Sequence, residues 1–242
     1  MAVQYEIFTN IGKRQVNEDN VCVAKKDDSY CFTLADGLGG HGKGEVASQM
    51  VAQSICGKFK NEEITEKFLK DAYVEAQEKL AWEKKQRHET TSMMTTAVSL
   101  VIRDNTAKWA HIGDSRLYLF RKNKVVLRTI DHSVPQMLVL SKELRERKIR
   151  NHPDRNKLTK AFGSTKRIIE CTESKSMPLD SCQSFLLCSD GFWELIYERE
   201  MCRTLKKSKS VSEWVDQMVE IIVRRGKDRD MDNFSAIAVW IK

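Results

Sequence analysis

Four short acidic segments lie far apart in this chain, and each follows or interrupts an apolar stretch: Asp36-Gly37, Asp114-Ser115, Asp190-Gly191 and Asp232-Asn233. A fifth, Glu18-Asp19, follows Arg14 near the N-terminus. The chain carries a formal net charge of +7, so composition does not explain acids gathered at the ends of strand-like runs. Carboxylates that share a cleft repel one another unless cations neutralise them, and hard divalent ions such as Mg²⁺ and Mn²⁺ do so through oxygen ligands. The pattern predicts a fold that brings these segments together around a metal centre.

Strand-like runs surround most of these acids. The runs are short, rich in β-branched and aromatic residues and bounded by Gly, Asp or Asn. They span Cys31–Ala35, Ala97–Ile102, Lys108–Ile112, Leu117–Phe120, Ser184–Cys188 and Ser235–Ile241. Residues 121–124 are typical of a hairpin connection to a further run at Val125–Leu127. Tight turns between neighbouring runs favour antiparallel pairing.

Three segments have helical periodicity. One apolar face extends from Val46 to Phe59, and another extends from Trp214 to Val223, with Ser212 as the expected N-cap. Residues 62–85 predict a long exposed helix with three side chains turned inward: Phe68, Tyr73 and Leu80. The polar segment 131–153 is expected to be helical in part. Apolar helix faces need sheets to cover, so the sequence predicts a β-sandwich layered with helices.

The length and composition suit one compact domain over residues 1–242. Hydrophobic residues make up 41% and charged residues 31%, which is typical of a globular protein. The chain has only three prolines and no low-complexity linker that would divide it. We therefore expect no internal domain boundary.

Location and redox state are indicated by what the sequence lacks. No basic segment followed by an apolar core opens the chain, and no apolar run approaches the roughly 20 residues that span a bilayer. None of the seven cysteines forms a Cys-x-x-Cys pair, which supports neither a disulfide framework nor a zinc ribbon. Cys31 and Cys188 lie in strand-like runs and are expected to be buried. We expect a cytoplasmic protein with reduced thiols and no membrane partner, and we expect a monomer.

A sequence pI of about 9.0 raises the alternative of a nucleic-acid-binding domain. The basic residues, however, are scattered along probable helices, are interrupted by acids and lack interleaved aromatic residues. A solvated helix face, or long-range attraction of phosphorylated substrates, accounts for the charge equally well. We therefore expect no nucleic-acid partner.

Six motifs occur in a fixed order along the chain: Gly12-Lys13-Arg14-Gln15-Val16-Asn17-Glu18-Asp19, Ala35-Asp36-Gly37-Leu38-Gly39-Gly40, His111-Ile112-Gly113-Asp114-Ser115-Arg116, Asp131-His132-Ser133, Leu187-Cys188-Ser189-Asp190-Gly191 and Asp232-Asn233. Together they resemble the metal-dependent protein phosphatases of the PPM, or type 2C, family. The match covers nearly the whole chain, and the compact length resembles the bacterial members. The resemblance implies an α+β fold in which two central antiparallel sheets are flanked by helices, a four-layer αββα sandwich.

The same resemblance implies a binuclear Mn²⁺ or Mg²⁺ site at one end of the sandwich. Asp36 would bridge the two ions, and the backbone carbonyl of Gly37 would ligate one of them. Asp190 and Asp232 would hold the other ion. Two metals close together activate a water for attack on phosphorus and neutralise the charge of the phosphoryl group.

Further roles follow from position within the motifs. Glu18 would contact the metals chiefly through water, with Asp19 close by, and Asp114 would take a third, weaker ion together with Asp190. Arg14 would grip the phosphate, because its planar fork matches phosphate oxygens where a lysine offers only a point charge. A flap from Ser133 to Asn156 would border the cleft and influence substrate choice.

Each assignment has a structural alternative. Asp-Gly and Asp-Asn are ordinary turn pairs, so any one of the acids alone is a turn residue more often than a ligand. Asp114 could cap a turn, and Arg14 could form a structural ion pair with Glu18. Many eukaryotic relatives carry His as a candidate general acid where this chain has Leu38, and His41 is expected to be a turn residue, not its replacement.

The resemblance implies hydrolysis of phosphoserine and phosphothreonine on proteins, in opposition to a cognate Ser/Thr kinase of a bacterial cytoplasm. The alternative is a catalytically silent relative that binds phosphoproteins as a scaffold. Retention of Arg14, Asp36, Asp190 and Asp232 argues against a silent relative, because decay usually removes at least one ligand. The substrate, the kinase and the metal used in the cell are not named by the sequence.

Overall fold

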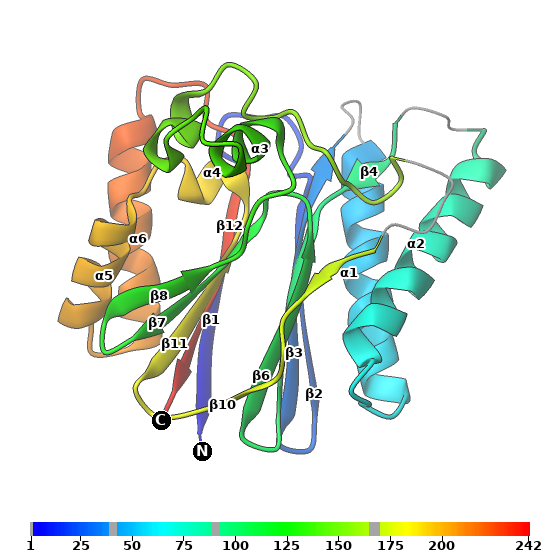
Figure 1. Ribbon diagram of the computed structural model, residues 1–242, viewed down its shortest axis with the longest axis horizontal. Coiled ribbons are helices and arrows are strands. Elements are labelled where there is room, and N and C mark those ends of the chain that lie inside the picture. Colours follow the sequence, from blue (N-terminus) through cyan, green and yellow to red (C-terminus); the bar gives the residue numbers. More distant parts are fainter. Residues whose placement is uncertain (1, 39–42, 89–91, 165–169) are drawn as a thin grey trace.

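The computed structural model describes residues 2–38, 43–88, 92–164 and 170–242. Two antiparallel sheets face each other at the centre, and a pair of helices covers the outer face of each sheet (Figure 1). One pair comprises α1 (Lys43–Asn61) and α2 (Phe68–Gln86), and the other comprises α5 (Glu198–Lys207) and α6 (Val211–Gly226). The four-layer αββα sandwich expected from the sequence is confirmed. Within the described ranges, no helix has the length and apolar character needed to cross a bilayer.

The first sheet contains both ends of the chain. Its strands follow the order β1 (Val3–Asn10), β12 (Phe234–Ile241), β11 (Gln183–Cys188), β7 (Arg116–Arg121) and β8 (Lys124–Arg128). The predicted hairpin joins β7 to β8 through Lys122 and Asn123, whose φ angles are 49° and 60°. Two consecutive residues with positive φ are typical of the type I′ turn, whose twist matches the flanking strands.

The second sheet lies between the first sheet and α1 and α2. Its strands follow the order β10 (Met177–Pro178), β6 (Thr106–Ile112), β5 (Ala97–Arg103), β3 (Ser29–Leu38) and β2 (Asp19–Lys26). Two short strands extend it, β4 (Met94–Thr95) beside β3 and β9 (Thr172–Glu173) beside β6. All six predicted strand runs fall in strands of the two sheets, whereas β1 and β2 were not predicted.

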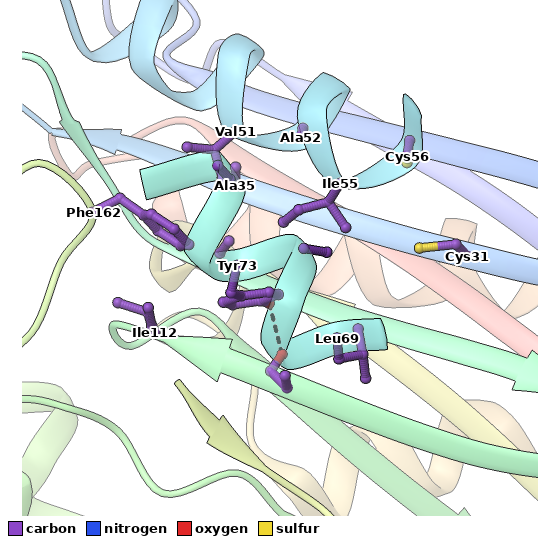
Figure 2. Close-up of a cluster of buried hydrophobic side chains, with 14 of the residues drawn as sticks. Cys31, Ala35, Val51, Ala52, Ile55, Cys56, Leu69, Tyr73, Ile112 and Phe162 are labelled. Carbon is purple, nitrogen blue, oxygen red and sulfur yellow. Dashed lines mark hydrogen bonds between the residues drawn. The ribbon is translucent and has the colours of Figure 1, made fainter. Parts of the chain in front are cut away.

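Three apolar clusters separate the four layers, one between the sheets and one beneath each helix pair. Figure 2 shows the cluster under α1 and α2, where Tyr73 donates a 2.8 Å hydrogen bond to the carbonyl of Ala110. Phe68, Tyr73 and Leu80 are buried there as expected. This bond satisfies a phenol that would otherwise be costly to bury.

Two helix boundaries differ from the prediction. The helix expected over 62–85 begins only at Phe68, because α1 continues to Asn61 and the chain must then reverse so that both helices cover one sheet. The expected cap of α6 at Ser212 is wrong: the hydroxyl of Ser210 accepts the bond from the Glu213 amide, 3.1 Å away. The Glu213 carboxylate in turn accepts from the Lys209 amide, which holds the chain at the start of the helix.

The remaining helices gather at one end of the sandwich. They are α3 (Val134–Leu140), the 3₁₀ helix η1 (Glu146–Asn151) and α4 (Asp190–Trp193). The segment between β8 and β9 is therefore helical in part, as predicted. Strands β3, β6 and β11 end at this side and β2 and β12 begin there, while the two termini lie at the opposite end (Figure 1).

Candidate metal centre

A cleft of about 670 Å³ opens at the end of the sandwich where the acidic segments meet. Thirteen described residues line it: Arg14, Gln15, Val16, Glu18, Asp36, Gly37, Leu38, Asp114, Asn156, Leu158, Asp190, Asp232 and Asn233. The structure therefore brings together every predicted ligand except Asp19, which is buried and does not line the cleft. Asp228 and Asp230, which lie close to Asp232 in the sequence, do not line the cleft.

The antiparallel topology explains this convergence. One end of the sandwich holds the ends of strands β3, β6 and β11 and the starts of β2 and β12. Acids placed just inside or just outside these strands therefore meet at that end. Asp19 and Asp36 are directly paired across β2 and β3. Like charges opposite each other destabilise a sheet. The arrangement is therefore not explained by stability of the fold.

Burial and mutual repulsion disfavour the charged forms of the central carboxylates. Burial raises the pKa of Asp36 well above its ordinary value, and the neighbouring carboxylates of Asp19 and Asp190 raise it further. The pKa of Asp190 is raised by the same causes, with Asp114 as the strongest neighbour. Burial raises the pKa of Asp114 to about 7. A nearby positive charge would reverse these shifts.

Glu18 and Asp19 add further carboxylate oxygens at this end of the sandwich. Burial raises the pKa of Asp19 to about 6, although Ser189 donates a 2.8 Å hydrogen bond to its Oδ2. Its Oδ1 and the Oε1 of Glu18 are buried and have no hydrogen-bond partner among the described residues. Burial also raises the pKa of Glu18, against the effect of the Gly44 amide in the first turn of α1. Unpaired buried carboxylate oxygens are costly, so a cation is the natural partner for them.

Arg14 spans Asp232 in a bidentate pair, with Nε–Oδ1 and Nη2–Oδ2 distances of 3.0 Å each. Its Nη1 also lies 3.5 Å from Asp230. The alternative ion pair with Glu18 is thus replaced by one with Asp232. As the side chains stand, no three His, Cys, Asp or Glu residues in the described ranges are grouped closely enough to hold one ion. The pairing with Arg14 engages both carboxylate oxygens of Asp232 with the guanidinium.

The donor set nevertheless fits hard divalent cations. Every candidate ligand is a carboxylate or backbone oxygen, the donor type that Mg²⁺ and Mn²⁺ prefer. Gly37 offers its carbonyl where a side chain has no room, since a Cβ there would lie 2.4 Å from the Gly44 backbone. The buried oxygens without partners and the raised carboxylate pKa values both call for positive charge at this place.

Asn233 ties the loop that carries Arg14 to the start of β12. Its Oδ1 accepts a 2.8 Å bond from the Glu18 amide, and its Nδ2 donates to the carbonyls of Ile11 and Val16, 2.8 and 3.0 Å away. One side chain therefore holds both ends of the loop. The sequence placed Asn233 in a motif but did not predict this role, which depends on contacts across more than 200 residues.

The flap meets the cleft at one point. Of residues 133–156 only Asn156 lines the cleft, with Leu158 just beyond. The flap is instead tied to α4, because Arg150 donates to the Trp193 carbonyl at 3.1 Å and Arg155 pairs with Glu194 at 3.0 Å. These contacts place the flap against the helix that begins with Asp190. Sequence analysis did not predict either arginine contact.

Histidine chemistry at the cleft is limited in the described part of the chain. Leu38 lines the cleft where a histidine was a candidate acid in relatives, and His41 lies outside the described residues. His132 does not line the cleft, and its Nδ1 accepts a hydrogen bond from the Gly113 amide. No histidine is among the described residues that line the cleft, so no described histidine is in place to protonate a leaving group.

Comparisons with known proteins point in one direction. The protein phosphatase 2C family matches residues 9–234 of this chain. The serine/threonine phosphatase Stp of Listeria welshimeri is 31% identical over 223 residues, which cover 88% of this chain and 87% of that protein. The structure of the serine/threonine phosphatase Stp1 from Staphylococcus aureus is 27% identical, has a TM-score of 0.89 and covers 100% of this chain and 96% of that one. The catalytic domain of PstP in complex with two manganese ions is 24% identical, with a TM-score of 0.83 over 98% of this chain and 97% of that one, and is similar in fold.

Proposed function

The chain belongs to the protein phosphatase 2C family of metal-dependent phosphatases, and we propose that its acidic cleft hydrolyses phosphoserine and phosphothreonine on proteins. One observation carries the assignment of the site. Burial and mutual repulsion drive three carboxylates of the cleft, those of Asp36, Asp114 and Asp190, toward their neutral forms. Buried oxygens of Glu18 and Asp19 nearby have no hydrogen-bond partner among the described residues. Such a site is unfavourable alone and becomes favourable when cations bind.

We assign two Mn²⁺ or Mg²⁺ ions to this cleft. Asp36 and the Gly37 carbonyl would hold one ion, and Asp36, Asp190 and Asp232 the other. Glu18 would act through water, with Asp19 behind it, and Asp114 with Asp190 would take a third, weaker ion. Bound there, divalent ions supply Lewis acidity, which lowers the pKa of water and neutralises phosphoryl charge.

Arg14 is the only cationic side chain among the described residues that line the cleft. Its fork can donate two parallel hydrogen bonds to a phosphoryl group, as it now donates two to the Asp232 carboxylate. Arg14 must therefore leave Asp232 before it binds substrate. The same release frees Asp232 as a ligand, so substrate binding and metal binding by these two residues favour each other.

The substrates would be phosphorylated proteins, and a cognate Ser/Thr kinase would supply them. Residues 1–242 would form one catalytic domain with the flap at 133–156, acting as a cytoplasmic monomer. The flap borders the cleft through Asn156, which makes it a candidate for contacts with the protein around the phosphorylated residue. A silent phosphoprotein-binding scaffold is disfavoured because the ligand set is intact.

The test is hydrolysis of a phosphothreonine peptide by metal-stripped protein to which Mn²⁺ is restored. Asp36→Asn and Asp190→Asn keep side-chain size and should each lower kcat by about 100-fold or more, since even partners of metal ligands contribute 10–100-fold. Asp228→Asn is the matched control, because this exposed acid lies outside the cleft and should keep wild-type turnover.

Circular dichroism must show the same fold for all four proteins. A folded, Mn²⁺-loaded wild type that releases no phosphate would contradict the proposed function. If that protein still bound the phosphopeptide tightly, the scaffold alternative would be supported instead.

A further inference from the structure

The backbone on both sides of the Asp114 side chain is held by hydrogen bonds from other elements. The Gly113 amide donates to Nδ1 of His132 at 3.1 Å, and the Gly113 carbonyl accepts from the His132 amide at 2.9 Å. The indole Nε1 of Trp193 donates to the Asp114 carbonyl at 3.0 Å. The His132 ring stacks on His111 with ring centres 4.6 Å apart, so the first of these partners is itself fixed.

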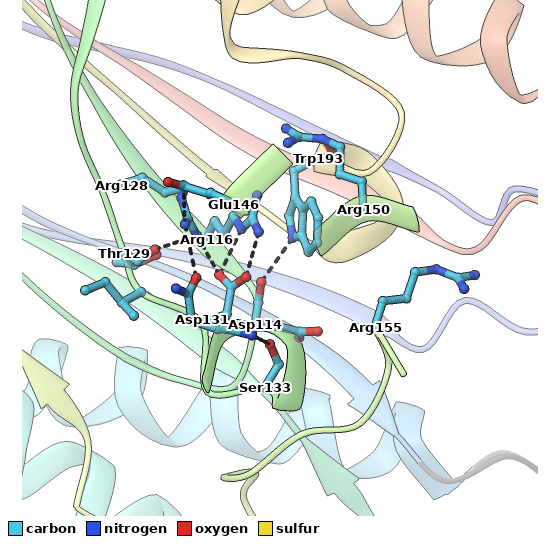
Figure 3. Close-up of polar contacts among 12 residues, drawn as sticks. Asp114, Arg116, Arg128, Thr129, Asp131, Ser133, Glu146, Arg150, Arg155 and Trp193 are labelled. Carbon is cyan, nitrogen blue, oxygen red and sulfur yellow. Dashed lines mark hydrogen bonds and ion pairs between the residues drawn. The ribbon is translucent and has the colours of Figure 1, made fainter. Parts of the chain in front are cut away.

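Trp193 is held in place from several directions (Figure 3). It is 1% exposed and is the last residue of α4, the helix that begins with Asp190. Cζ of Arg116 lies 3.4 Å from its ring centre, and Arg116 makes a bidentate pair with Asp131 at 2.9 and 2.6 Å. Arg150 of the flap donates to its carbonyl. The indole therefore has little freedom to move away from Asp114.

The indole bond adds to a link that the first sheet already makes. Asp114 lies in the short loop between β6 of the second sheet and β7 of the first, and Asp190 follows β11, which pairs with β7. Both carboxylates line the cleft, and Arg116 and Cys188, which lie two residues from Asp114 and Asp190, are directly paired across β7 and β11. The bond from Trp193 to the Asp114 carbonyl directly links the two peptide segments that carry these carboxylates.

We propose that Trp193 is a positioning residue whose indole N–H sets the spacing between Asp114 and Asp190, so that both carboxylates can ligate one ion. The inference rests on the proposed function, in which these two residues share the weaker ion. Trp193 touches neither substrate nor metal in this role. It acts by holding the loop between β6 and β7 against the helix that follows β11.

Trp193→Phe separates the hydrogen bond from the packing, because phenylalanine retains an aromatic face for Arg116 and removes only the donor and part of the ring. The chain offers a matched control in Trp214→Phe. Trp214 is also fully buried, and its Nε1 also donates to a backbone carbonyl, that of Met201 at 3.2 Å, but far from the cleft. Both substitutions remove one buried indole bond.

Calorimetric titration of metal-stripped protein with Mn²⁺ is the first readout. In Trp193→Phe the weakest binding step should lose about five- to tenfold in affinity, the effect of one neutral hydrogen bond, while the tighter steps are unchanged. Trp214→Phe should match wild type at every step. Equal metal affinities in the two variants would overturn the inference.

A second measurement, NMR of the indole N–H groups, leaves the Trp193 side chain in place. The chain has five tryptophans, so five indole N–H signals are expected in the ¹⁵N spectrum of wild type. During a Mg²⁺ titration the Trp193 signal should shift with the weak binding step, and the Trp214 signal should stay. Should Trp193→Phe fail to fold, the signal is assigned by elimination with the other four Trp→Phe variants.

The outcomes separate this inference from the proposed function. If wild type shows Mn²⁺-dependent turnover but its Trp193 indole signal does not shift during the weak binding step, the inferred role of Trp193 is overturned and the proposed function is not. Wild type without any Mn²⁺-dependent turnover overturns the proposed function itself. A steady-state comparison adds a further check: at low Mn²⁺ the Trp193→Phe protein should lose kcat, and high Mn²⁺ should restore it.

Discussion

A single amide group, that of Asn233, fixes the loop from Ile11 to Glu18 that carries Arg14. Asn233→Ala removes three hydrogen bonds and leaves the Glu18 amide and two carbonyls to find other partners. We expect KM for a phosphothreonine peptide to rise about fivefold or more, because Arg14 is then less well placed to bind phosphate. Steady-state kinetics at saturating Mn²⁺ measures the change.

The control for this prediction is Arg14→Ala. If Asn233 acts through Arg14, then Asn233→Ala should add little to KM in the Arg14→Ala background, because the two residues act as one unit. If the increases in KM from the two single substitutions multiply in the double variant, Asn233 supports the cleft in some other way.

Individual residues of the site could be predicted where chemistry and position along the chain were enough. Asp36, Asp190 and Asp232 stood out because each lies beside a strand-like run, and the structure brings all three to one cleft. The pairing of Arg14 with Asp232 could not be predicted, because it depends on which strand ends become neighbours. The same holds for the link from Trp193 to Asp114.

Helix α6 gives a test at the scale of elements. Ser210 caps its first turn through the Glu213 amide, whereas Ser212 lies within that turn. Ser210→Ala should lower the free energy of unfolding by about 1 kcal/mol, and Ser212→Ala on the same helix should change it by a few tenths at most. Urea denaturation of both variants measures the difference.

Both serine variants should keep wild-type turnover, because α6 covers the outer face of the first sheet. A larger loss for Ser212→Ala than for Ser210→Ala would place the start of the helix two residues later. The sequence contained the signal for the correct cap, since Ser210 and Glu213 have the spacing of a capping box.

Elements were predicted best where their apolar residues face a core. Strands β3, β5, β11 and β12 are almost continuously buried, and their runs were found. Strand β1 is an edge strand with mostly exposed or half-exposed residues, so its composition does not distinguish it from a loop. The start of α2 was predicted too early because helix-forming residues fill the turn between α1 and α2, and only packing of both helices on one sheet sets where α2 begins.

Stability of the whole molecule should depend on pH in a direction set by the acidic cleft. Burial raises the pKa of Asp19 to about 6 and that of Asp114 to about 7, whereas aspartate in an unfolded chain titrates near 3.9. The folded protein thus keeps protons that the unfolded chain has released. The contribution of these groups to stability is present at about pH 4 and is lost as pH rises to about 7.

Thermal unfolding in chelator at pH 5 and pH 7.5 measures this effect. Asp114→Asn should stabilise the metal-free protein more at pH 7.5 than at pH 5, because it removes one of the groups that lose their proton. Mn²⁺ at 100 times its dissociation constant should add about 2.7 kcal/mol to wild type and reverse the loss. An Asp114→Asn effect that is the same at both pH values would contradict the proposed titration.

The termini lie at the end of the sandwich opposite the cleft, and there the chain almost closes on itself. Ala2 and Lys242 exchange two backbone hydrogen bonds, of 2.8 and 2.9 Å, across β1 and β12. Anything attached to either end therefore emerges from one pole, while a phosphorylated protein approaches the other (Figure 1). The enzyme can be immobilised, labelled or fused through that pole without narrowing the space that a bulky substrate needs.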